Sequence, residues 1–377
     1  MKYVYTVFTL LLLAVTQLLS ETNTSFKPGQ LWYDTDGHPI NAHAGGMLYH
    51  EDQYYWFGQI TIPGRRGADS WVGVNCYSSK DLYNWKNEGV AFHVFDHASH
   101  QATRGCKIER PKVIYNKKTK KFVMWWHHDI NGQKHDNAMV GIAVSDTVAG
   151  PYQFVRTFRP LSGFLPFNIS DEMRDAPVPE IAKTYRFTGG SLPQDADSLL
   201  LFKRDLNIGQ MVRDMTMFVD DDDKAYHIYA SEENGTLHIA ELSDDYLGYT
   251  GKYARFFPGR FMEAPTIFKK DGKYYIIASG CTSWAPNAAR SAVADNIFGP
   301  WKELGNPCIG EDAEITFDSQ GTFVLPVQNK PGAFIFMADR WKPATQHDSR
   351  YVWLPIQFEG ERPILKWSDE WDLSQFN

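Results

Sequence analysis

The sequence predicts an all-β protein, a five-bladed β-propeller, and two observations support this fold class. The first is a β-hairpin signal that recurs five times along the 377 residues: an apolar run, a charged turn and an aromatic-rich run. The second is that no segment shows a sustained helical period. Repeats that each supply three or four strands are typical of a propeller, whereas a sandwich or barrel would not explain the recurrence.

The clearest hairpin has Asp271-Gly272 as its turn, and Asp-Gly between two apolar runs is a strong hairpin signal. The five predicted hairpins lie at residues 49–58, 115–126, 219–230, 268–278 and 327–338. A second element follows four of them and indicates a turn into an outer strand, at residues 78–85, 145–152, 243–249 and 294–301. Three of these begin with Ser-Asp or Ala-Asp, and the first reads Ser78-Ser-Lys-Asp. We expect a first strand within residues 31–44 to pair with strands at 351–358, which would close the ring and remove two exposed edges.

Residues 161–210 separate the second and third hairpins and are rich in Pro, Asp and Gly. We expect them to form a long inserted loop within a single catalytic domain, residues 21–377. Residues 1–20 have the pattern of a secretory signal peptide, with Lys2 before an apolar run too short to span a bilayer. The expected location is therefore secreted or periplasmic.

The net charge of −7 argues against a nucleic acid or an anionic membrane as partner, since both need a basic surface. We expect a monomer without membrane insertion. No Cys–His cluster has zinc spacing, and no feature demands a calcium ion, so no cofactor or metal is expected.

Export would make the four cysteines candidates for disulfides. The pairings Cys76–Cys106 and Cys281–Cys308 close the shortest loops and are favoured, with four free buried thiols as the alternative. Three glycosylation sequons, which matter only in a glycosylating host, begin at Asn23, Asn168 and Asn234.

One polar residue precedes or opens each predicted hairpin: His43, Glu109, Asp214, Glu263 and Gln320. The innermost strands of a propeller begin around the central channel, so these side chains should converge. Converging carboxylates can divide acid and base work, because burial and neighbours separate their pKa values. Glycoside hydrolysis commonly uses such a pair. For each carboxylate alone, an ion pair between blades is the alternative.

From about residue 37 to 358 the chain resembles glycoside hydrolases of family 43, and more narrowly their exo-β-1,3-galactanase-like branch. The resemblance is carried by eight motifs in order: Asn41-Ala-His-Ala-Gly-Gly, Ile108-Glu-Arg-Pro, Arg213-Asp-Met-Thr-Met-Phe-Val, Met262-Glu-Ala-Pro, Ser283-Trp-Ala-Pro-Asn, Asp318-Ser-Gln, Ala338-Asp-Arg-Trp and Ser349-Arg-Tyr-Val-Trp.

The resemblance implies a five-bladed propeller that acts as a secreted, exo-acting, inverting hydrolase. Its substrate would be a poly- or oligosaccharide, with galactose released from β-1,3-galactan. An α-L-arabinofuranosidase or β-xylosidase on the same fold is the alternative enzyme. A non-catalytic carbohydrate-binding propeller and a protein-docking propeller are the alternatives from other classes.

Three catalytic roles follow from the resemblance. Glu263 matches the general acid, and its apolar neighbours Met262 and Ala264 would raise its pKa by desolvation. Asp214 matches the carboxylate that orients the acid and tunes its pKa. Glu109 matches an essential carboxylate of the galactanase-like branch.

The general base is the unusual part of the predicted site. Much of the family has an Asp base on the first blade, where this chain reads His43-Ala44-Gly45-Gly46. The resemblance to the galactanase-like branch implies that a Gln, in its amide or imidic form, positions the attacking water, and Gln320 stands at that place. Asp318 shares a face with Gln320 in an extended strand and is the alternative base.

The predicted sugar-binding residues are His43, Gln59, Trp284, Asn287 and Arg340. An indole face suits the apolar face of a pyranose, so Trp284 is the expected stacking platform. Gln59 stands where the branch commonly has Glu, which puts one sugar-hydroxyl contact in doubt. Arg340 is equally explained as an ion pair between blades.

Overall fold

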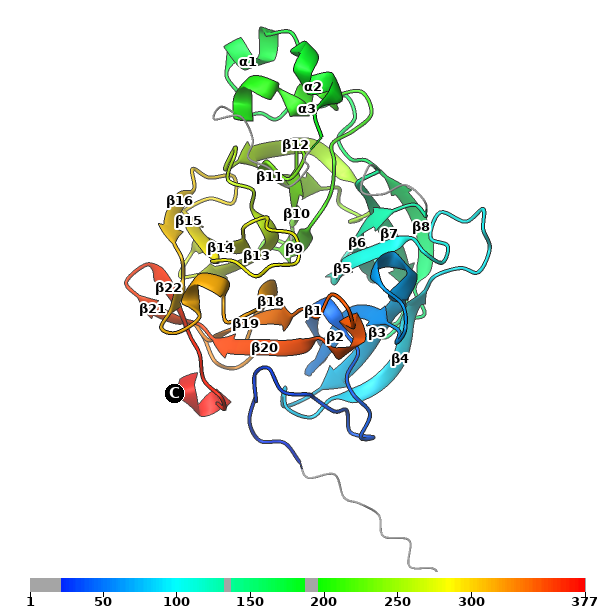
Figure 1. The fold of residues 1–377 in the computed structure, drawn as a ribbon, viewed down its shortest axis with the longest axis vertical. Helices are drawn as coiled ribbons and strands as arrows, with labels where there is room; N and C mark the ends of the chain where they lie inside the picture. The colour runs from blue at the N-terminus through cyan, green and yellow to red at the C-terminus, as the bar shows by residue number, and fades with distance from the viewer. Residues whose placement is uncertain (1–21, 132–136, 187–195, 377) are drawn as a thin grey trace, which may run out of the picture.

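The computed structural model describes residues 22–131, 137–186 and 196–376, and these form an all-β propeller (Figure 1). The predicted propeller is confirmed, but the predicted number of five blades is wrong, because the described strands form six sheets. The predicted signal peptide, residues 1–20, lies outside the described residues.

The first two sheets are antiparallel and have four strands each. Their strands, in spatial order, are β1 (His43–His50), β2 (Gln53–Thr61), β3 (Trp71–Ser79) and β4 (Lys86–His93), then β5 (Lys107–Asn116), β6 (Lys121–Asp129), β7 (Met139–Ser145) and β8 (Gln153–Phe158).

The next two sheets have the same organisation. They consist of β9 (Met215–Val219), β10 (Ala225–Ser231), β11 (Thr236–Leu242) and β12 (Tyr249–Phe256), then β13 (Glu263–Lys270), β14 (Lys273–Ser279), β15 (Arg290–Ala294) and β16 (Lys302–Gly305). The fifth sheet has three strands, β18 (Gln320–Pro326), β19 (Phe334–Arg340) and β20 (Arg350–Pro355).

The sixth sheet explains the wrong blade number. It has the order β17 (Cys308–Ile309), β22 (Arg362–Lys366) and β21 (Gln357–Glu359). Its strands β17 and β22 pair in parallel although they are far apart in the sequence. The sheet lies at the edge of the ring, where β22 contacts β20 (Figure 1).

The five predicted hairpins are all present, as the antiparallel pairs β1–β2, β5–β6, β9–β10, β13–β14 and β18–β19. In the β13–β14 turn, Asp271 and Gly272 both have a positive φ, of 51° and 78°, as a two-residue hairpin turn requires. The first strands of these hairpins, β1, β5, β9, β13 and β18, contact one another in turn and surround the centre.

The ring closes between its first and last sheets without a shared strand. The predicted pairing of residues 31–44 with 351–358 is wrong in detail, because β1 pairs with β2. Instead, the segment before β1 reaches the C-terminal part: Gly29 N–H donates to Tyr351 O at 2.8 Å, and Phe26 and Trp371 form an antiparallel bridge. Phe26 also stacks on Trp371, with ring centroids 4.4 Å apart.

Residues 161–210 connect β8 to β9 and project from the edge of the ring (Figure 1, green). Their described part contains short helices rather than an irregular loop alone: α1 (Asp171–Asp175), α2 (Glu180–Thr184), η2 (Ala196–Leu199) and α3 (Leu201–Arg204). Further 3₁₀ helices lie in other connections, η1 (Gly67–Ser70), η3 (Ala313–Ile315) and η4 (Gln346–Asp348), and η5 (Leu373–Phe376) follows the last strand.

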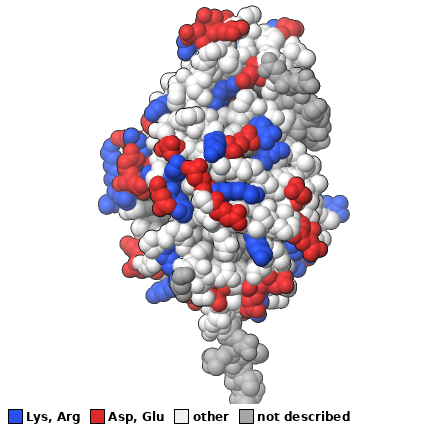
Figure 2. Space-filling view, turned by 90° about the vertical axis from the view of Figure 1, so that its left-hand side faces the viewer, with Lys and Arg blue, Asp and Glu red and all other residues white. Residues whose placement is uncertain are grey.

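The outer surface carries both signs of charge. Figure 2 shows acidic and basic side chains interspersed over one side of the molecule, as the modest net charge of −7 leads one to expect. Among the described residues, no helix is long and apolar enough to cross a membrane.

Candidate active site

A cavity of about 400 Å³ opens where the inner strands begin. It brings together six of the nine predicted site residues: Gln59, Glu109, Asp214, Glu263, Trp284 and Gln320. It also contains side chains to which the sequence analysis gave no role: Trp71, Lys107, Arg110, His127, Arg213, Asn234 and Trp341.

A repeated backbone feature sets the direction of three site side chains. The strand register shifts directly after His43, Glu109 and Glu263, at the start of β1, β5 and β13. The next residue is left-handed in each case, with φ of 50° at Ala44, 54° at Arg110 and 50° at Ala264. Such bulges bend a strand and re-aim a side chain, and they are common beside active sites.

Buried polar groups stabilise these bulges. Lys112 Nζ donates to the carbonyl oxygens of Ala44 and Arg110, at 3.1 and 3.3 Å. The Ala44 N–H donates to Asp339 Oδ2 at 2.5 Å, and the Ala264 N–H donates to Asp214 Oδ2 at 3.0 Å. Buried side chains therefore hold the backbone of the left-handed residues in place by hydrogen bonds.

Glu263 has the environment of a general acid. Burial raises its pKa, the nearby Asp214 carboxylate raises it further, and the result is about 7. Its Oε1 accepts hydrogen bonds from Asn234 Nδ2 at 2.9 Å and from Cys281 Sγ at 3.0 Å. Glu263 can therefore carry a proton near neutral pH, which is what protonation of a leaving group requires.

Asp214 is linked to Gln320 through Arg110. Arg110 Nε lies 2.8 Å from Asp214 Oδ1, and Arg110 Nη2 donates to Gln320 Oε1 at 2.7 Å. Gln320 Nε2 in turn donates to Ser279 Oγ at 3.0 Å. Both ends of the Gln320 amide are thus fixed, and its carbonyl oxygen keeps a second lone pair for a further donor.

Glu109 is paired with a buried histidine. His127 Nδ1 lies 2.8 Å from Glu109 Oε2, and His127 Nε2 lies 3.2 Å from Asp129 Oδ2. Burial lowers the pKa of His127, but its hydrogen bonds to Asp129 and Glu109 outweigh this effect and raise the pKa to about 9. The imidazolium therefore holds Glu109 as a carboxylate at the cavity wall.

Glu109, His127 and Asp214 also place their ligand atoms within 4.8 Å of one another, a spacing that could hold a metal ion. Each of the three already has a partner of opposite charge, since Arg110 pairs with Asp214 and His127 with Glu109. The geometry therefore favours an ion-pair network over a cation site.

Aromatic rings line the mouth and wall of the cavity. Trp284 is 47% exposed and meets Trp341 edge-on, with ring centroids 5.9 Å apart. On the wall, the Gln59 amide is assigned the orientation that satisfies both of its neighbours. In it, Gln59 accepts a hydrogen bond from Trp71 Nε1 at 3.3 Å and donates to Ile108 O at 3.1 Å. Gln59 is 1% exposed, so it orients the Trp71 indole rather than presenting its amide to solvent.

Three predicted sugar-binding residues do not line this cavity. His43 is fully buried and stacks on Tyr351 with centroids 5.3 Å apart, and burial lowers its pKa to about 3. Asn287 braces the loop that carries Trp284: its Oδ1 accepts from Gly280 N at 2.6 Å. Arg340 donates to Phe317 O at 2.8 Å and lies over the Trp367 ring.

Asp318, the alternative base, faces a neighbouring hollow of about 40 Å³ that it shares with Asn287 and Gln320. Its side chain is 54% exposed and lies 3.5 Å from Arg340 Nε. Asp318 does not line the main cavity, so it is less well placed than Gln320 to contact an attacking water.

The favoured pairings Cys76–Cys106 and Cys281–Cys308 are absent, and the four thiols are free, as in the alternative. Cys76, Cys106 and Cys308 are buried, and Cys281 donates to Glu263, which lines the active-site cavity. The sequon at Asn234 is also reinterpreted: the side chain is 5% exposed and contacts Glu263, so it has no room for a glycan.

For some of the cavity residues that had no predicted role, the sequence did contain a local signal. Arg110 and Trp341 stand inside the quoted motifs, directly after Glu109 and Arg340. His127 lies directly opposite Glu109 in the β5–β6 hairpin. The contact of Asn234 with Glu263 joins two different sheets and depends on how they come together.

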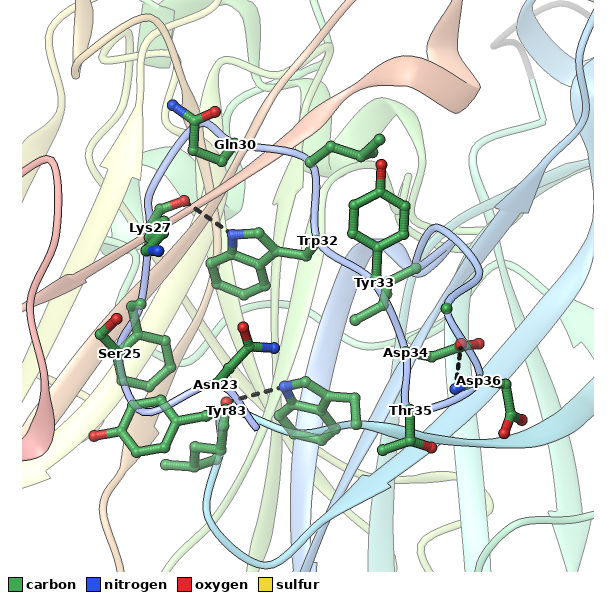
Figure 3. Close-up of a pocket in the computed structure, with 16 residues that line it drawn as sticks. Asn23, Ser25, Lys27, Gln30, Trp32, Tyr33, Asp34, Thr35, Asp36 and Tyr83 are labelled. Carbon is green, nitrogen blue, oxygen red and sulfur yellow. Dashed lines mark hydrogen bonds between the residues drawn. The ribbon is translucent and has the colours of Figure 1, made fainter. Parts of the chain in front are cut away.

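A second cavity, of about 420 Å³, lies beside the N-terminal segment and is distinct from this site (Figure 3). It is lined by Trp32, Tyr33 and Tyr83 together with Asp34 and Asp36, but by none of the predicted site residues. The Asp34 carboxylate is already used locally, because Oδ1 accepts the N–H groups of Asp36 and His38. The chemistry therefore belongs to the first cavity.

A propeller with a recessed cavity, a carboxyl group of raised pKa and two further carboxylates is the arrangement expected of a glycoside hydrolase. Comparison with known proteins agrees: residues 201–340 match the family described as glycosyl hydrolases family 43. A comparison with curated proteins gave no match.

Solved structures give a more detailed comparison. A GH43 β-1,3-galactosidase solved with galactodeoxynojirimycin is 51% identical, covers 92% of this chain and 100% of its own, and has a TM-score of 0.87. An exo-β-1,3-galactanase from Phanerochaete chrysosporium, solved with β-1,3-galactotriose, is 30% identical over 93% of this chain and 68% of its own (TM-score 0.75). An exo-β-1,3-galactanase from Clostridium thermocellum is 34% identical over 92% of this chain and 66% of its own (TM-score 0.73). The chain belongs to glycosyl hydrolase family 43.

Proposed function

We propose that the chain is an exo-acting β-1,3-galactosidase that releases galactose from the ends of β-1,3-galactan with inversion of configuration. The observation that carries this proposal is the 51% identity, over the full length of the neighbour, to a β-1,3-galactosidase solved with galactodeoxynojirimycin. The similarity to the two exo-β-1,3-galactanases supports the exo action and the linkage.

Glu263 is the proposed general acid. Its pKa of about 7 keeps a large fraction protonated at neutral pH, so it can donate to the leaving glycosidic oxygen. Asp214 stays close as an anion paired with Arg110, which keeps the proton on Glu263. After the proton has left, Arg110 and Arg213 offset the new charge on Glu263.

Gln320 is the proposed water-positioning group. A neutral amide cannot take up a proton as a carboxylate does, but its oxygen can accept one hydrogen bond from the attacking water. The water oxygen bonds to the anomeric carbon as the glycosidic bond breaks. The proton that the water loses passes to solvent, from which Glu263 is protonated again. The positive charge that develops on the sugar is then stabilised by Glu109, which His127 holds in the ionised form.

Product analysis tests the reaction type and the linkage together. Incubation with β-1,3-linked galactooligosaccharides should release galactose as the first product, shortening the chain by one residue at a time. Proton NMR of the fresh product should show α-galactose. Release of internal fragments, or of β-galactose, would overturn the exo or the inverting part of the proposal.

A panel of aryl glycosides tests the sugar. The β-galactoside should be hydrolysed in preference to the α-L-arabinofuranoside and the β-xyloside. Preference for either of the last two would replace the galactosidase by the alternative enzyme on the same fold.

We also propose that the protein is exported and acts as a monomer. The support for export is the pattern of residues 1–20, and the test is N-terminal sequencing of the mature protein, which should begin near residue 21. Size-exclusion chromatography with light scattering should give a mass close to the 43.1 kDa of the chain, less the leader.

A further inference from the structure

The connection between β10 and β11 is an unusual buried turn, Glu232-Glu233-Asn234-Gly235. Three successive non-glycine residues in it are left-handed, with φ of 52°, 57° and 67° at Glu232, Glu233 and Asn234. All three are at most 5% exposed. Left-handed residues are costly outside glycine, so a run of three persists only when its surroundings hold it, and such strain is often found at functional sites.

Ion pairs hold the first residue of this turn. Glu232 accepts two hydrogen bonds from Arg255, each of 2.8 Å, and one from His238, also of 2.8 Å. Arg255 reaches in turn to Asp197 at 2.7 Å. Asp197 belongs to η2, in the segment that connects β8 to β9.

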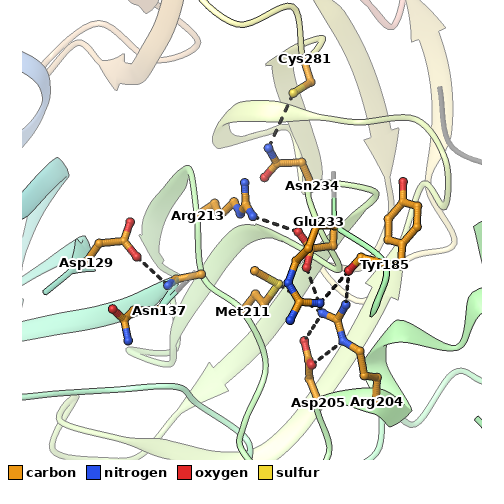
Figure 4. Close-up of polar contacts among 12 residues, drawn as sticks. Asp129, Asn137, Tyr185, Arg204, Asp205, Met211, Arg213, Glu233, Asn234 and Cys281 are labelled. Carbon is orange, nitrogen blue, oxygen red and sulfur yellow. Dashed lines mark hydrogen bonds and ion pairs between the residues drawn. The ribbon is translucent and has the colours of Figure 1, made fainter. Parts of the chain in front are cut away.

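The second residue, Glu233, is held by two arginines (Figure 4). Arg204 Nη2 lies 3.2 Å from Glu233 Oε1, and Arg213 Nη2 lies 3.0 Å from Glu233 Oε2. Arg204 comes from α3 of the connecting segment and also pairs with Asp205, at 2.7 Å. The segment at residues 196–204 therefore clamps the turn on two of its three strained residues.

The third residue, Asn234, points to the general acid. Asn234 Nδ2 donates to Glu263 Oε1 at 2.9 Å, and Cys281 Sγ lies 3.0 Å from the same oxygen. Because both donors meet Oε1, a proton on Glu263 resides on the other oxygen, Oε2. The contact thus decides which oxygen donates the proton as well as where the carboxyl group points.

We propose that Asn234 is a positioning residue that orients Glu263 for proton donation, and that the segment at residues 196–204 holds Asn234 in place through Arg204 and Glu233. The inference rests on the proposed role of Glu263 as the acid. It gives the inserted segment a part in catalysis although none of its described residues lines the cavity.

The variant Asn234→Gly separates the effect of the side-chain amide from the effect of the backbone conformation. Glycine adopts φ of 67° without strain, so the turn keeps its shape while the donor to Glu263 is lost. We expect kcat/KM on β-1,3-galactobiose to fall by about 10–100-fold, as displacement of a reacting group by about 1 Å does. On an aryl β-galactoside with a good leaving group, which needs little protonation, the loss should be much smaller.

Asn329→Gly is the matched control. Asn329 is exposed, has φ of 61° and lies in the β18–β19 turn, away from the cavity, so this change should leave both activities unaltered. The melting temperature of each variant shows whether the fold is kept. If Asn234→Gly is as active as the control on both substrates, the amide has no positioning role and the proposal is overturned.

Asn234→Asp supplies a readout that a purely structural role would not change. Aspartate tolerates the left-handed conformation but brings a second carboxylate to Glu263, which raises the pKa of the acid. The alkaline limb of the kcat/KM profile should therefore move to higher pH. An unchanged limb would contradict a direct contact between the two side chains.

A double-mutant cycle tests the clamp. Arg204→Gln should weaken the activity on galactobiose, and it should have little further effect in the Asn234→Gly background, because both changes act through one contact. Fully additive losses would overturn the role of residues 196–204. Glu263→Gln separates this inference from the function: if it shows no dependence on the leaving group, the acid itself is misassigned, whatever Asn234 does.

Discussion

Gln320 and Asp318 lie two residues apart, yet their surroundings differ. Gln320 is fixed at both ends by Arg110 and Ser279, whereas Asp318 is half exposed beside Arg340. Gln320→Ala should therefore lower the rate by about 10²-fold or more, because the attacking water loses its orienting group. Asp318→Asn should cost less than about fivefold, since an exposed ion pair contributes about 0–1 kcal/mol.

Steady-state rates on β-1,3-galactobiose measure both effects. An inactive Asp318→Asn beside an active Gln320→Ala would reverse the assignment and identify a carboxylate base. Gln320→Glu is an informative companion variant, because it offers a base of the same length at the same place.

Asp214 tunes the acid, and this role can be tested by pH. Its negative charge favours the protonated form of Glu263, so Asp214→Asn should lower the pKa of Glu263 from about 7. The alkaline limb of kcat/KM reports loss of the proton from the acid and should move to lower pH. A limb that stays near pH 7 would show that burial alone sets the pKa.

At the scale of the element, the bulges that open the inner strands link backbone strain to the site. Ala264 is fully buried with φ of 50°, a conformation that β-branched side chains avoid. Ala264→Val should lower stability by about 1–3 kcal/mol and displace Glu263, so activity should fall with the melting temperature.

Ala264→Gly is the control for the bulge. Glycine relieves the left-handed strain but removes one buried methyl group, and these effects oppose each other, so its melting temperature should stay close to that of the wild type. A stable and fully active Ala264→Val would show that the bulge does not constrain Glu263.

The elements also show which parts of the fold could be predicted from the sequence. The five hairpins could be predicted because each is local, with turn residues such as Asp271-Gly272 between two apolar runs. The sixth sheet could not, because β17 has only two residues and pairs with β22, far along the chain. Short strands joined by long-range pairing carry no periodic signal.

Within the site, too, residues with a local sequence signal could be predicted and contacts between sheets could not. Glu109, Asp214, Glu263 and Gln320 could be proposed because each stands at the start of a predicted hairpin. The contact from Asn234 to Glu263 joins different sheets, so it follows from the packing of the ring and not from any local pattern. His43, Asn287 and Arg340 do not line this cavity, and their sugar contacts stay a prediction.

At the scale of the whole molecule, the ring depends on contacts between its two ends. Phe26 is 2% exposed and packs on Trp371, Trp353 and Tyr83. Phe26→Ala should lower the free energy of unfolding by about 3–5 kcal/mol, as removal of a buried aromatic ring does. Phe26 does not line the active-site cavity, so the specific activity of folded protein should be kept at low temperature.

Denaturant titration followed by tryptophan fluorescence measures the loss. Phe167→Ala is a suitable comparison, because Phe167 is 50% exposed and its removal should change stability by less than about 1 kcal/mol. Equal losses for the two variants would show that the contact between the ends does not stabilise the ring.

Each of the first five sheets is made from one continuous stretch of chain, and the four carboxylate and amide groups of the site come from four of them. Sheets of this kind can open and close as separate cooperative units, which amide hydrogen exchange detects one by one. The active site, by contrast, exists only while all four are docked at once. Catalysis should therefore disappear at a lower urea concentration than the far-ultraviolet circular dichroism of the strands, and the most readily exchanging sheet should set the limit for the working enzyme.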